Sequence, residues 1–146
     1  MRCFVTGATG FIGRRLIKAL LEDGLPCRGL SRMPVSEATS LAVDLGDKTA
    51  LIAACAGVTS VFHCAGHAHA FGSLTAEDVA MHWQVNFEGT RNLVEAAGMA
   101  GVRRFVFLSS GQAVAAPGDL MGVAIAPGLT TSAGALAERR STAAGE

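Results

Sequence analysis

The sequence contains no tyrosine, a single tryptophan and only two lysines, Lys18 and Lys48. Its 12 lysine and arginine residues are matched by 12 aspartate and glutamate residues, so the formal net charge is zero. A neutral chain has no extended positive field, which argues against nucleic acid or an anionic membrane surface as a partner. No apolar run is long enough to span a bilayer and the first ten residues lack a secretory core, so we expect a cytoplasmic protein.

Cysteine and histidine patterns typical of disulfides or metal sites are also missing. The four cysteines, Cys3, Cys27, Cys55 and Cys64, lie in apolar segments without CxxC spacing, and we interpret them as small buried hydrophobic residues.

The histidines near the middle of the chain do not complete a metal site. His63, His67 and His69 lie close together, but no nearby set of carboxylates or thiolates completes a tetrahedral shell. We therefore predict no metal. A substrate-facing role for His67 or His69 stays open.

Apolar runs alternate with helical patterns along the first 110 residues. The predicted strands are residues 1–6, 27–31, 60–64 and 103–109, the last of which would be the fourth. The predicted helices are residues 11–23, a pattern through Leu51, Ile52 and Cys55 that ends at Gly57, and a long helix after Thr75. Residues 32–42 are interpreted as a polar link. This alternation favours an α/β fold, a Rossmann-like doubly wound parallel sheet with helices on both faces.

The long helix should begin at a Thr75 cap and run to about Gly98. Its predicted inward stripe repeats at steps of four and three residues: Val79, Trp83, Asn86, Thr90, Leu93 and Ala97. A buried carboxamide is costly unless its donors and acceptors are matched, so Asn86 should tie the helix to a neighbouring strand or loop. We expect Trp83 and the phenylalanines to belong to the core.

The composition changes after Phe107, the last aromatic residue. Residues 111–146 are dominated by Ala, Gly, Ser and Thr, which offer little large apolar surface to offset the entropy of ordering. We therefore divide the chain into a domain at residues 1–110 and a divergent, poorly ordered tail at residues 111–146.

Three glycines follow the first predicted strand at three-residue spacing and open a predicted helix. Gly7 would permit a tight turn, Gly10 would let the backbone approach a pyrophosphate, and Gly13 would allow the helix to pack closely. The alternative is that small residues merely make a tight connection, but the flanking strand and helix favour a phosphate site.

Four ordered motifs, TGATGFIG at residues 6–13, VFHCAG at 61–66, VNFEGTRNLVEAA at 85–97 and RRFVFLSS at 103–110, carry a resemblance to a known family. The chain resembles the extended short-chain dehydrogenase/reductases of the NAD-dependent epimerase/dehydratase type. The similarity covers about residues 1–110, the N-terminal part of that fold, so the sheet is expected to be incomplete on its C-terminal side.

The resemblance implies a dinucleotide site, NAD or NADP, with these residues: Gly7, Thr9, Gly10, Phe11, Ile12, Gly13, Ser31, Arg32, Asp44, Leu45, Cys64, Ala65 and Gly66. It implies that the amides of Phe11 and Ile12 lie beside the pyrophosphate and that Asp44 contacts the adenine amino group. Residues 64–66 would pass the nicotinamide-side ribose. The alternative for Asp44 is an ordinary solvated aspartate at a helix start.

The residues at the end of the second predicted strand bear on the choice of cofactor. An acidic side chain there suits the ribose hydroxyls of NAD, whereas a basic one suits the 2′-phosphate of NADP. Ser31 and Arg32 stand at these positions, which tilts the prediction toward NADP. Arg32 could equally be a solvated loop charge.

The catalytic residues of the family are only partly represented. Ser110 aligns with its catalytic Ser or Thr, although a strand-end serine satisfied by the backbone is the alternative. The family's acid/base is a Tyr in a Tyr-x-x-x-Lys helix, and this sequence has no Tyr, while both lysines precede the third predicted strand. The residues present can hold a dinucleotide but cannot run the family's redox cycle.

These observations leave three hypotheses for the function of the chain. The first is the NAD(P)-binding portion of an epimerase/dehydratase/reductase-type oxidoreductase acting on a nucleotide sugar or another small hydroxy or keto compound. The rival is a non-catalytic module that senses dinucleotides or assembles, for instance as a homo-oligomer, through its exposed fourth-strand edge. A chain too incomplete to fold stably is the third. Three explanations could account for the tail: a truncated or decayed gene product, a binding module that has lost its catalytic activity, or a tail read in a shifted frame. We favour the first or the last.

Overall fold

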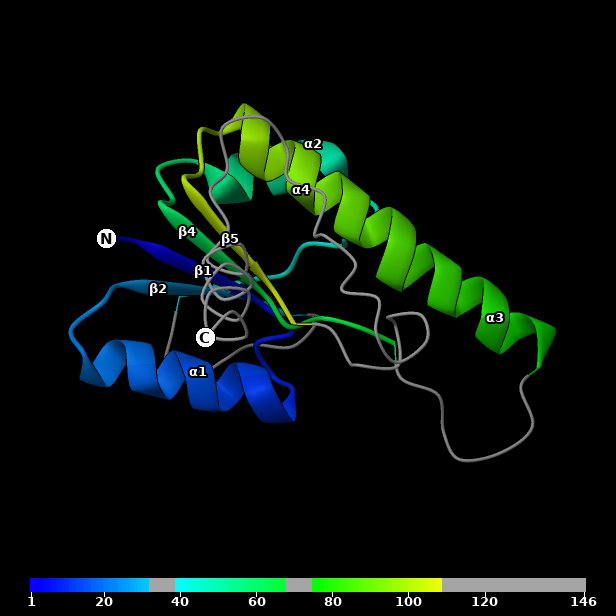
Figure 1. Cartoon of the computed structure of the whole chain (residues 1–146), viewed down its shortest axis with the longest axis horizontal. Helices are drawn as coiled ribbons and strands as arrows, with labels where there is room; N and C mark the ends of the chain where they lie inside the picture. The colour runs from blue at the N-terminus through cyan, green and yellow to red at the C-terminus, as the bar shows by residue number, and fades with distance from the viewer. Residues whose placement is uncertain (32–38, 68–74, 109–146) are drawn as a thin grey trace, which may run out of the picture.

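The computed structural model describes residues 1–31, 39–67 and 75–108. Its strands are β1 (Cys3–Thr6), β2 (Cys27–Leu30), β3 (Thr39–Leu41), β4 (Ser60–His63) and β5 (Arg104–Phe107). Its helices are α1 (Phe11–Glu22), α2 (Lys48–Cys55), α3 (Ala76–His82), the π-helix η1 (Trp83–Gly89) and α4 (Thr90–Met99). The five strands form one parallel sheet in the order β3-β2-β1-β4-β5, which confirms the predicted α/β class (Figure 1).

Helices cover both faces of the sheet, with α1 on one side and α2 and α4 on the other (Figure 1). Side chains alternate between faces along a strand, so β1 serves both layers. Phe4 packs with Leu51 and Leu93 toward α2 and α4, while Val5 packs with Ile17 of α1. The doubly wound arrangement therefore follows from the apolar character of β1 on both faces.

Helix ends follow the predicted signals. α1 ends before Gly24, which adopts a φ of 71°, a backbone conformation that favours glycine. Thr75 caps α3 through a capping box with Asp78. The predicted long helix exists, but it contains the π-helical turn η1 between its two α-helical parts.

The polar link predicted for residues 32–42 contains a strand that sequence analysis missed. β3 pairs with β2, with Arg28 opposite Thr39 and Leu30 opposite Leu41. A strand of three residues is too short to show alternation in the sequence. Residues 104–107 therefore form the fifth strand of the sheet and not the fourth.

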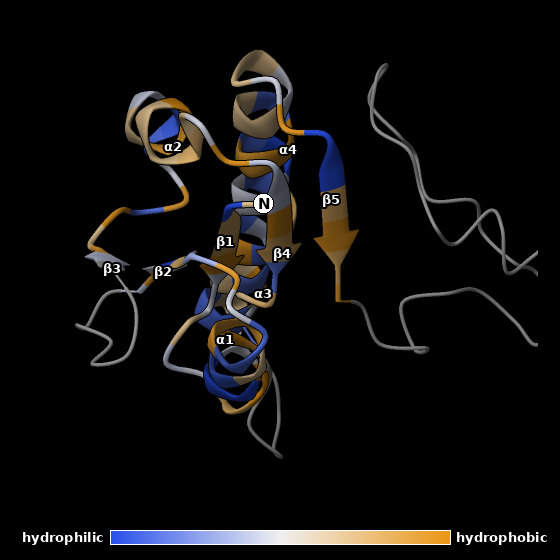
Figure 2. Cartoon of the chain, turned by 90° about the vertical axis from the view of Figure 1, so that its left-hand side faces the viewer, coloured by the Kyte–Doolittle hydropathy of each residue, from blue (hydrophilic) through white to orange (hydrophobic). Residues whose placement is uncertain are grey.

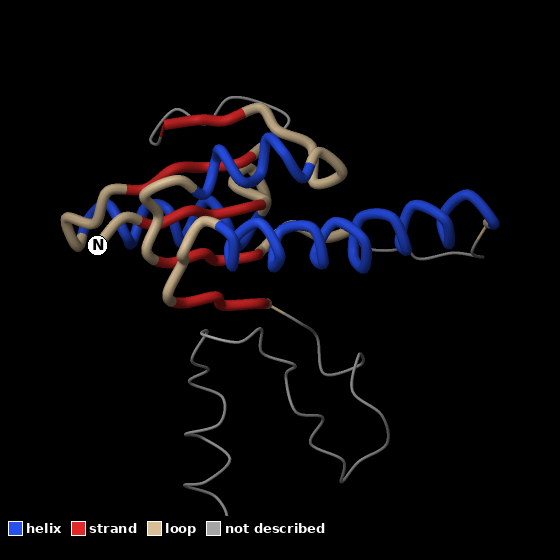
Figure 3. Tube along the Cα trace, turned by 90° about the horizontal axis from the view of Figure 1, so that it is seen from above, coloured by secondary structure: helices blue, strands red, loops and turns tan. Residues whose placement is uncertain are grey.

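The prediction that Trp83 and the phenylalanines belong to the core is wrong for several of them. Phe4 is fully buried, but Phe11, Trp83, Phe87 and Phe107 are 70%, 57%, 48% and 44% exposed. The helix that carries Trp83 and Phe87 runs out past the strands, so no helix or strand of the described residues covers its apolar face there (Figure 3). Val79, placed in the inward stripe, is 54% exposed for the same reason.

Among residues 1–31, 39–67 and 75–108, β5 is the last strand on its side of the sheet, and the predicted incompleteness of the sheet beyond it falls on residues outside this part of the chain. β5 is an outer strand of the described sheet and displays apolar colour along most of its length (Figure 2). Val106 is 40% exposed, and among residues 1–31, 39–67 and 75–108 no helix lies over it. Arg32, His69, Ser110 and the predicted tail lie outside the described residues.

Candidate functional site

A cavity of about 520 Å³ opens at the carboxyl ends of β1, β2 and β4. It is lined by Gly7, Thr9, Gly10, Leu30, Ser31, Val43, Asp44, Leu45, Gly46, Cys64, Ala65, Gly66, His67, Met81, Gln84 and Val85. The fold thus gathers nine of the thirteen predicted site residues, from the segments that follow β1, β2, β3 and β4, at one edge of the sheet. Ligands of open α/β sheets bind at this edge, next to the point where the strand order reverses.

The glycine turn after β1 is a close-packed connection. Gly7 has a φ of 64°, and a Cβ added to it would lie 2.7 Å from the Ala65 nitrogen. A Cβ on Gly13 would lie 2.1 Å from the Gly7 carbonyl oxygen. The roles predicted for Gly7 and Gly13, a tight turn and close helix packing, are confirmed by this geometry.

The amino end of α1 has no side-chain cap. Gly10 is its N-cap and has no side chain to bind the first amides, and the first turn carries no acidic residue. The amides of Phe11, Ile12 and Gly13 have no acceptor within the helix, and the helix dipole adds positive potential there. Phe11, Ile12 and Gly13 do not line the cavity, whereas Gly10, the N-cap of the helix, does.

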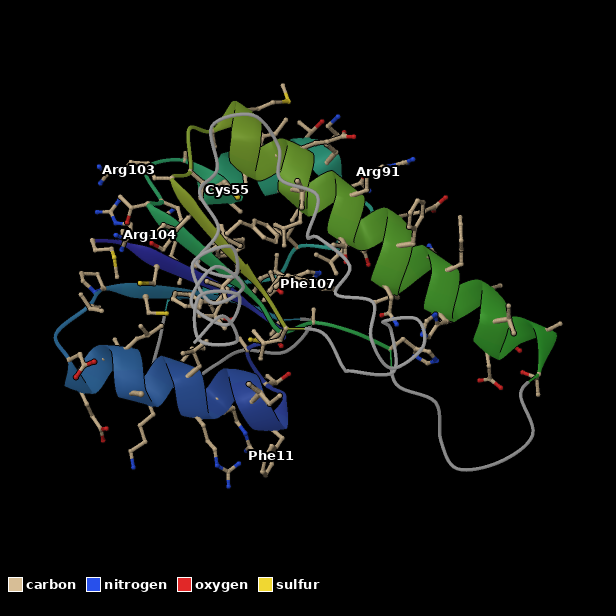
Figure 4. The ribbon with its side chains drawn as sticks, viewed as in Figure 1. Phe11, Cys55, Arg91, Arg103, Arg104 and Phe107 are labelled. Atoms are coloured by element: carbon tan, nitrogen blue, oxygen red, sulfur yellow. The ribbon has the colours of Figure 1, made fainter. Side chains whose placement is uncertain are left out.

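The exposed Phe11 ring has a cationic partner on the outer side of α1. The Arg15 guanidinium lies 3.8 Å from the ring centroid, and its Nη1 donates to the Phe11 carbonyl at 3.3 Å. Figure 4 shows Phe11 on the side of α1 that faces away from the sheet. Arg15 therefore stabilises the first turn of the helix without entering the cavity.

Two hydroxyl groups meet at the end of β2. Thr9 Oγ1 and Ser31 Oγ lie 3.0 Å apart, which joins the glycine turn to the second strand. Ser31 is buried and lines the cavity. The described part of this strand end thus presents neutral hydroxyls, whereas Arg32, the basis for preferring NADP, lies outside it.

Asp44 belongs to the cavity wall and not to a helix start. Its Oδ1 accepts a hydrogen bond from the Gly46 amide at 2.7 Å, forming a local turn. The cap of α2 is Asp47, whose Oδ1 accepts from the Ala50 amide at 2.9 Å. The aspartate at the helix start is therefore Asp47, and the alternative interpretation of Asp44 as a helix-start aspartate is wrong.

The neighbouring Leu45 is held against the helix that forms the opposite wall. Asn92 Nδ2 donates to the Leu45 carbonyl at 3.1 Å. A Cβ on Gly89 would lie 2.9 Å from the Leu45 Cβ, so the glycine permits this close approach. The segment that includes Asp44 and Leu45 is thus anchored by α4 and η1.

The carboxamide of Asn86 makes the connection that the sequence predicted. It accepts from the His67 amide at 2.6 Å and donates to the His67 carbonyl at 2.9 Å. These two bonds hold the loop after β4 against η1. The prediction that Asn86 ties its helix to a neighbouring loop is confirmed.

Cys64 is the cysteine that lines the cavity. Burial raises the pKa of its thiol, so it stays protonated near neutral pH and is a weak nucleophile. Cys3, Cys27 and Cys55 are buried as predicted, whereas Cys64 is only half-buried. The thiol contributes to the shape of the cavity.

His67, for which a substrate-facing role was left open, lines the cavity. Sequence reasoning missed several other residues of the cavity wall: Leu30, Val43, Gly46, Met81, Gln84 and Val85. Val43 and Gly46 flank the predicted pair at 44–45, and Gln84 and Val85 directly precede Asn86. For most of the missed residues, the signal available in the sequence was their position next to a residue already predicted to matter. Met81 lines the cavity because α3 runs past it, and the sequence pattern did not reveal the direction of that helix.

A sequence model described as the NAD dependent epimerase/dehydratase family matches residues 3–132. The chain belongs to this family. The match passes residue 110, so the similarity extends further than the four motifs.

Curated relatives point in the same direction. The chain is 35% identical over 127 residues to a 3-beta-hydroxysteroid dehydrogenase of Mycolicibacterium neoaurum, covering 82% of this chain and 35% of the relative. It is 36% identical over 110 residues to a UDP-glucose 4-epimerase of Vibrio cholerae, covering 73% and 34%. The chain therefore spans about a third of the length of these relatives.

Solved structures share the fold. A short-chain dehydrogenase/reductase superfamily protein from Agrobacterium tumefaciens with bound NAD is 39% identical at a TM-score of 0.68, covering 77% of this chain and 33% of that chain. The Thermus thermophilus UDP-glucose 4-epimerase in complex with NAD is 33% identical at a TM-score of 0.67, covering 76% and 38%. These similarities cover the Rossmann part of longer proteins.

Within residues 1–31, 39–67 and 75–108, no helix is both long and apolar enough to traverse a bilayer.

Proposed function

We propose that this family member holds a nicotinamide dinucleotide in the cavity at the carboxyl edge of its sheet. The observation that carries the proposal is the contact between Gly13 and the Gly7 carbonyl, which brings the uncapped start of α1 up to the cavity. Similarity to two structures solved with NAD supports it. The bound group would supply the hydride-accepting ring, while the residues of this chain bind and orient it.

The cavity residues and the adjoining first turn of α1 can be assigned to the parts of a dinucleotide. The amides of residues 11–13 would hold the pyrophosphate, since a helix N-terminus favours an anion. Ser31 and Asp44, on the β2 side, would meet the adenosine half. Residues 64–66, at the end of β4, would meet the nicotinamide half.

NAD is the cofactor that the relatives support, and NADP is the alternative that Arg32 supports. The described strand end carries no acidic side chain, which leaves space for a 2′-phosphate but adds no charge to attract it. We propose that both dinucleotides bind. A Kd for NADP well below that for NAD would assign Arg32 to the phosphate.

The chain would be the cofactor-binding part of an oxidoreductase. The substrate of that oxidoreductase would be a nucleotide sugar or another small hydroxy or keto compound, as the names of the relatives suggest. Ser110 would polarise the reacting oxygen. The 146 residues contain no tyrosine to exchange the proton, so we expect cofactor binding by this chain without turnover. The lack of tyrosine equally favours the second candidate, a dinucleotide-binding module without chemistry.

Calorimetric titration of the purified chain with NAD and NADP tests the proposal, with nicotinamide mononucleotide as the control that lacks the adenosine half. We expect saturable binding of a dinucleotide and a rise in the thermal unfolding midpoint. A chain that unfolds cooperatively but binds neither dinucleotide would refute the function. Hydride transfer from UDP-glucose to NAD, or from the reduced dinucleotide to a ketosteroid, would instead reject the non-catalytic module.

A further inference from the structure

His63 is a fully buried histidine at the end of β4 that does not line the cavity. Its ring lies between two threonines: Nδ1 is 2.6 Å from Thr6 Oγ1, and Nε2 is 2.8 Å from Thr90 Oγ1. Phe107 of β5 stacks on the ring at a centroid distance of 5.4 Å. Strands β1 and β5 and helix α4 thus enclose one imidazole.

The hydrogen-bond pattern determines where the protons lie. Thr90 Oγ1 donates its only proton to the Asn86 carbonyl at 2.7 Å, so it must accept from His63 Nε2–H. In the neutral imidazole Nδ1 then carries no proton and accepts from the Thr6 hydroxyl. Thr6 Oγ1 is left with lone pairs, one of which accepts from the Ala65 amide at 3.2 Å. Every donor in this relay has an acceptor.

The relay ends in the cavity wall. Ala65 lines the cavity, and its nitrogen is the atom against which Gly7 packs. At the other end, Asn86 holds His67 through its side chain. The orientation of the imidazole therefore links both ends of the 64–67 loop.

We propose that His63 is a positioning residue for the nicotinamide half of the dinucleotide. As the Nε2–H tautomer it ties Thr6 to Thr90 and so fixes the Ala65 amide at the cavity wall. This inference rests on the proposed function. In a dinucleotide fold the adenosine ribose lies at the end of the second strand, here β2, so the other half lies toward β4 and its loop.

Nuclear magnetic resonance of the unliganded chain tests the relay without any cofactor. Long-range nitrogen–proton correlations of His63 should show the Nε2–H tautomer, with the ring proton exchanging slowly with solvent. The Nδ1–H tautomer, or rapid exchange of the ring proton, would overturn the proposal.

Binding of NAD and ADP by a Thr6→Val variant tests the positioning role. ADP contains the adenosine half and the diphosphate but not the nicotinamide half. The variant should bind NAD about tenfold more weakly and ADP within about twofold of the original chain, because one buried hydrogen bond at the loop is lost. Thr90→Val interrupts the relay from α4 and should give the same split, so a Thr6→Val chain that fails to fold still leaves a test.

Thr59→Val is the matched control. Thr59 Oγ1 also accepts from a backbone amide and donates to a carbonyl, both of Arg2, but at the opposite end of the sheet. It should lower stability without changing the ratio of NAD to ADP affinity. If Thr6→Val and Thr90→Val lose both ligands equally, the positioning role is wrong while the proposed function stands. If the unaltered chain binds neither ligand, the proposed function fails and the positioning role with it.

Discussion

Two halves of the molecule differ in how completely they are enclosed. Around β1 and β4, Phe4, Val61, Ile17 and Leu93 are all fully buried between helices on both faces. Around β5 and the α3–η1 arm, large apolar residues are displayed instead. In Figure 4, Phe107 lies at the carboxyl end of β5, while Arg103 and Arg104 lie near its start.

This contrast predicts which substitutions should weaken the proposed cofactor binding. Most of the cavity wall comes from the enclosed half, and only Met81, Gln84 and Val85 come from the arm. The glycine turn lies in the enclosed half, as do Thr6 and His63 of the relay, whereas Phe107 and Asn86, which contact the relay, come from the open half. Substitutions in the enclosed half should affect binding and stability far more than substitutions in the open half.

The largest contrast is expected between two phenylalanines. Phe4→Ala removes a fully buried ring and should lower the free energy of unfolding by about 3–5 kcal/mol. Phe107→Ala removes a ring that is 44% exposed and should cost about 1 kcal/mol. Denaturant unfolding monitored by circular dichroism measures both. Equal losses would contradict the division into enclosed and open halves.

Next in size is the effect of a methyl group at the glycine turn. Gly13→Ala places a Cβ 2.1 Å from the Gly7 carbonyl oxygen, so α1 must move away from the cavity and NAD affinity should fall about 100-fold. Calorimetry measures the loss. Gly98→Ala is the control, because nothing lies within 4 Å of its added Cβ. That change should leave affinity unaltered and stabilise α4 by up to about 1 kcal/mol.

A smaller effect is expected from pH. Burial lowers the pKa of His63 to about 4 from the ordinary 6.5, so between these values the unfolded chain binds more protons than the folded one. Stability should therefore fall as pH drops, by on the order of 2 kcal/mol between neutral pH and pH 5. Denaturant unfolding at several pH values measures it. His63→Gln should remove this slope, whereas His82→Gln should keep it; an unchanged slope in His63→Gln would refute the assignment.

The smallest contrast concerns two helix caps. Asp47→Ala removes the cap of α2, whose buried residues belong to the core, and should lower global stability by about 1 kcal/mol. Thr75→Ala removes the cap of α3, which has no buried residue, and should fray that helix locally with little global effect. Amide hydrogen exchange separates the two. Global destabilisation by Thr75→Ala would show that the arm belongs to the cooperative core.

Much of the enclosed half could be predicted from sequence because its signals are local. The run at residues 3–6, the glycines at 7, 10 and 13 and the Thr75 cap each act within a few residues of chain. Asn86 was predictable because a carboxamide in an apolar stripe demands partners. Its partner, His67, was not, since the loop that carries it reaches η1 only in three dimensions.

The predictions that were wrong depended on neighbours that periodicity cannot reveal. Trp83 and Phe87 have apolar character at helical spacing, but the helix runs past the sheet there and leaves them exposed. β3 escaped notice because three residues carry too short a pattern. Its place is determined by pairing with β2.

The alternation of strands and helices and the glycine turn could be predicted from the sequence alone, because hydrophobic period and backbone conformational freedom are properties of short segments. The folded molecule was needed to establish which aromatics are buried, that Asp47 and not Asp44 caps α2, and that Thr6, His63 and Thr90 form one relay. Those outcomes depend on contacts between segments up to dozens of residues apart, and such contacts exist only once the sheet has formed.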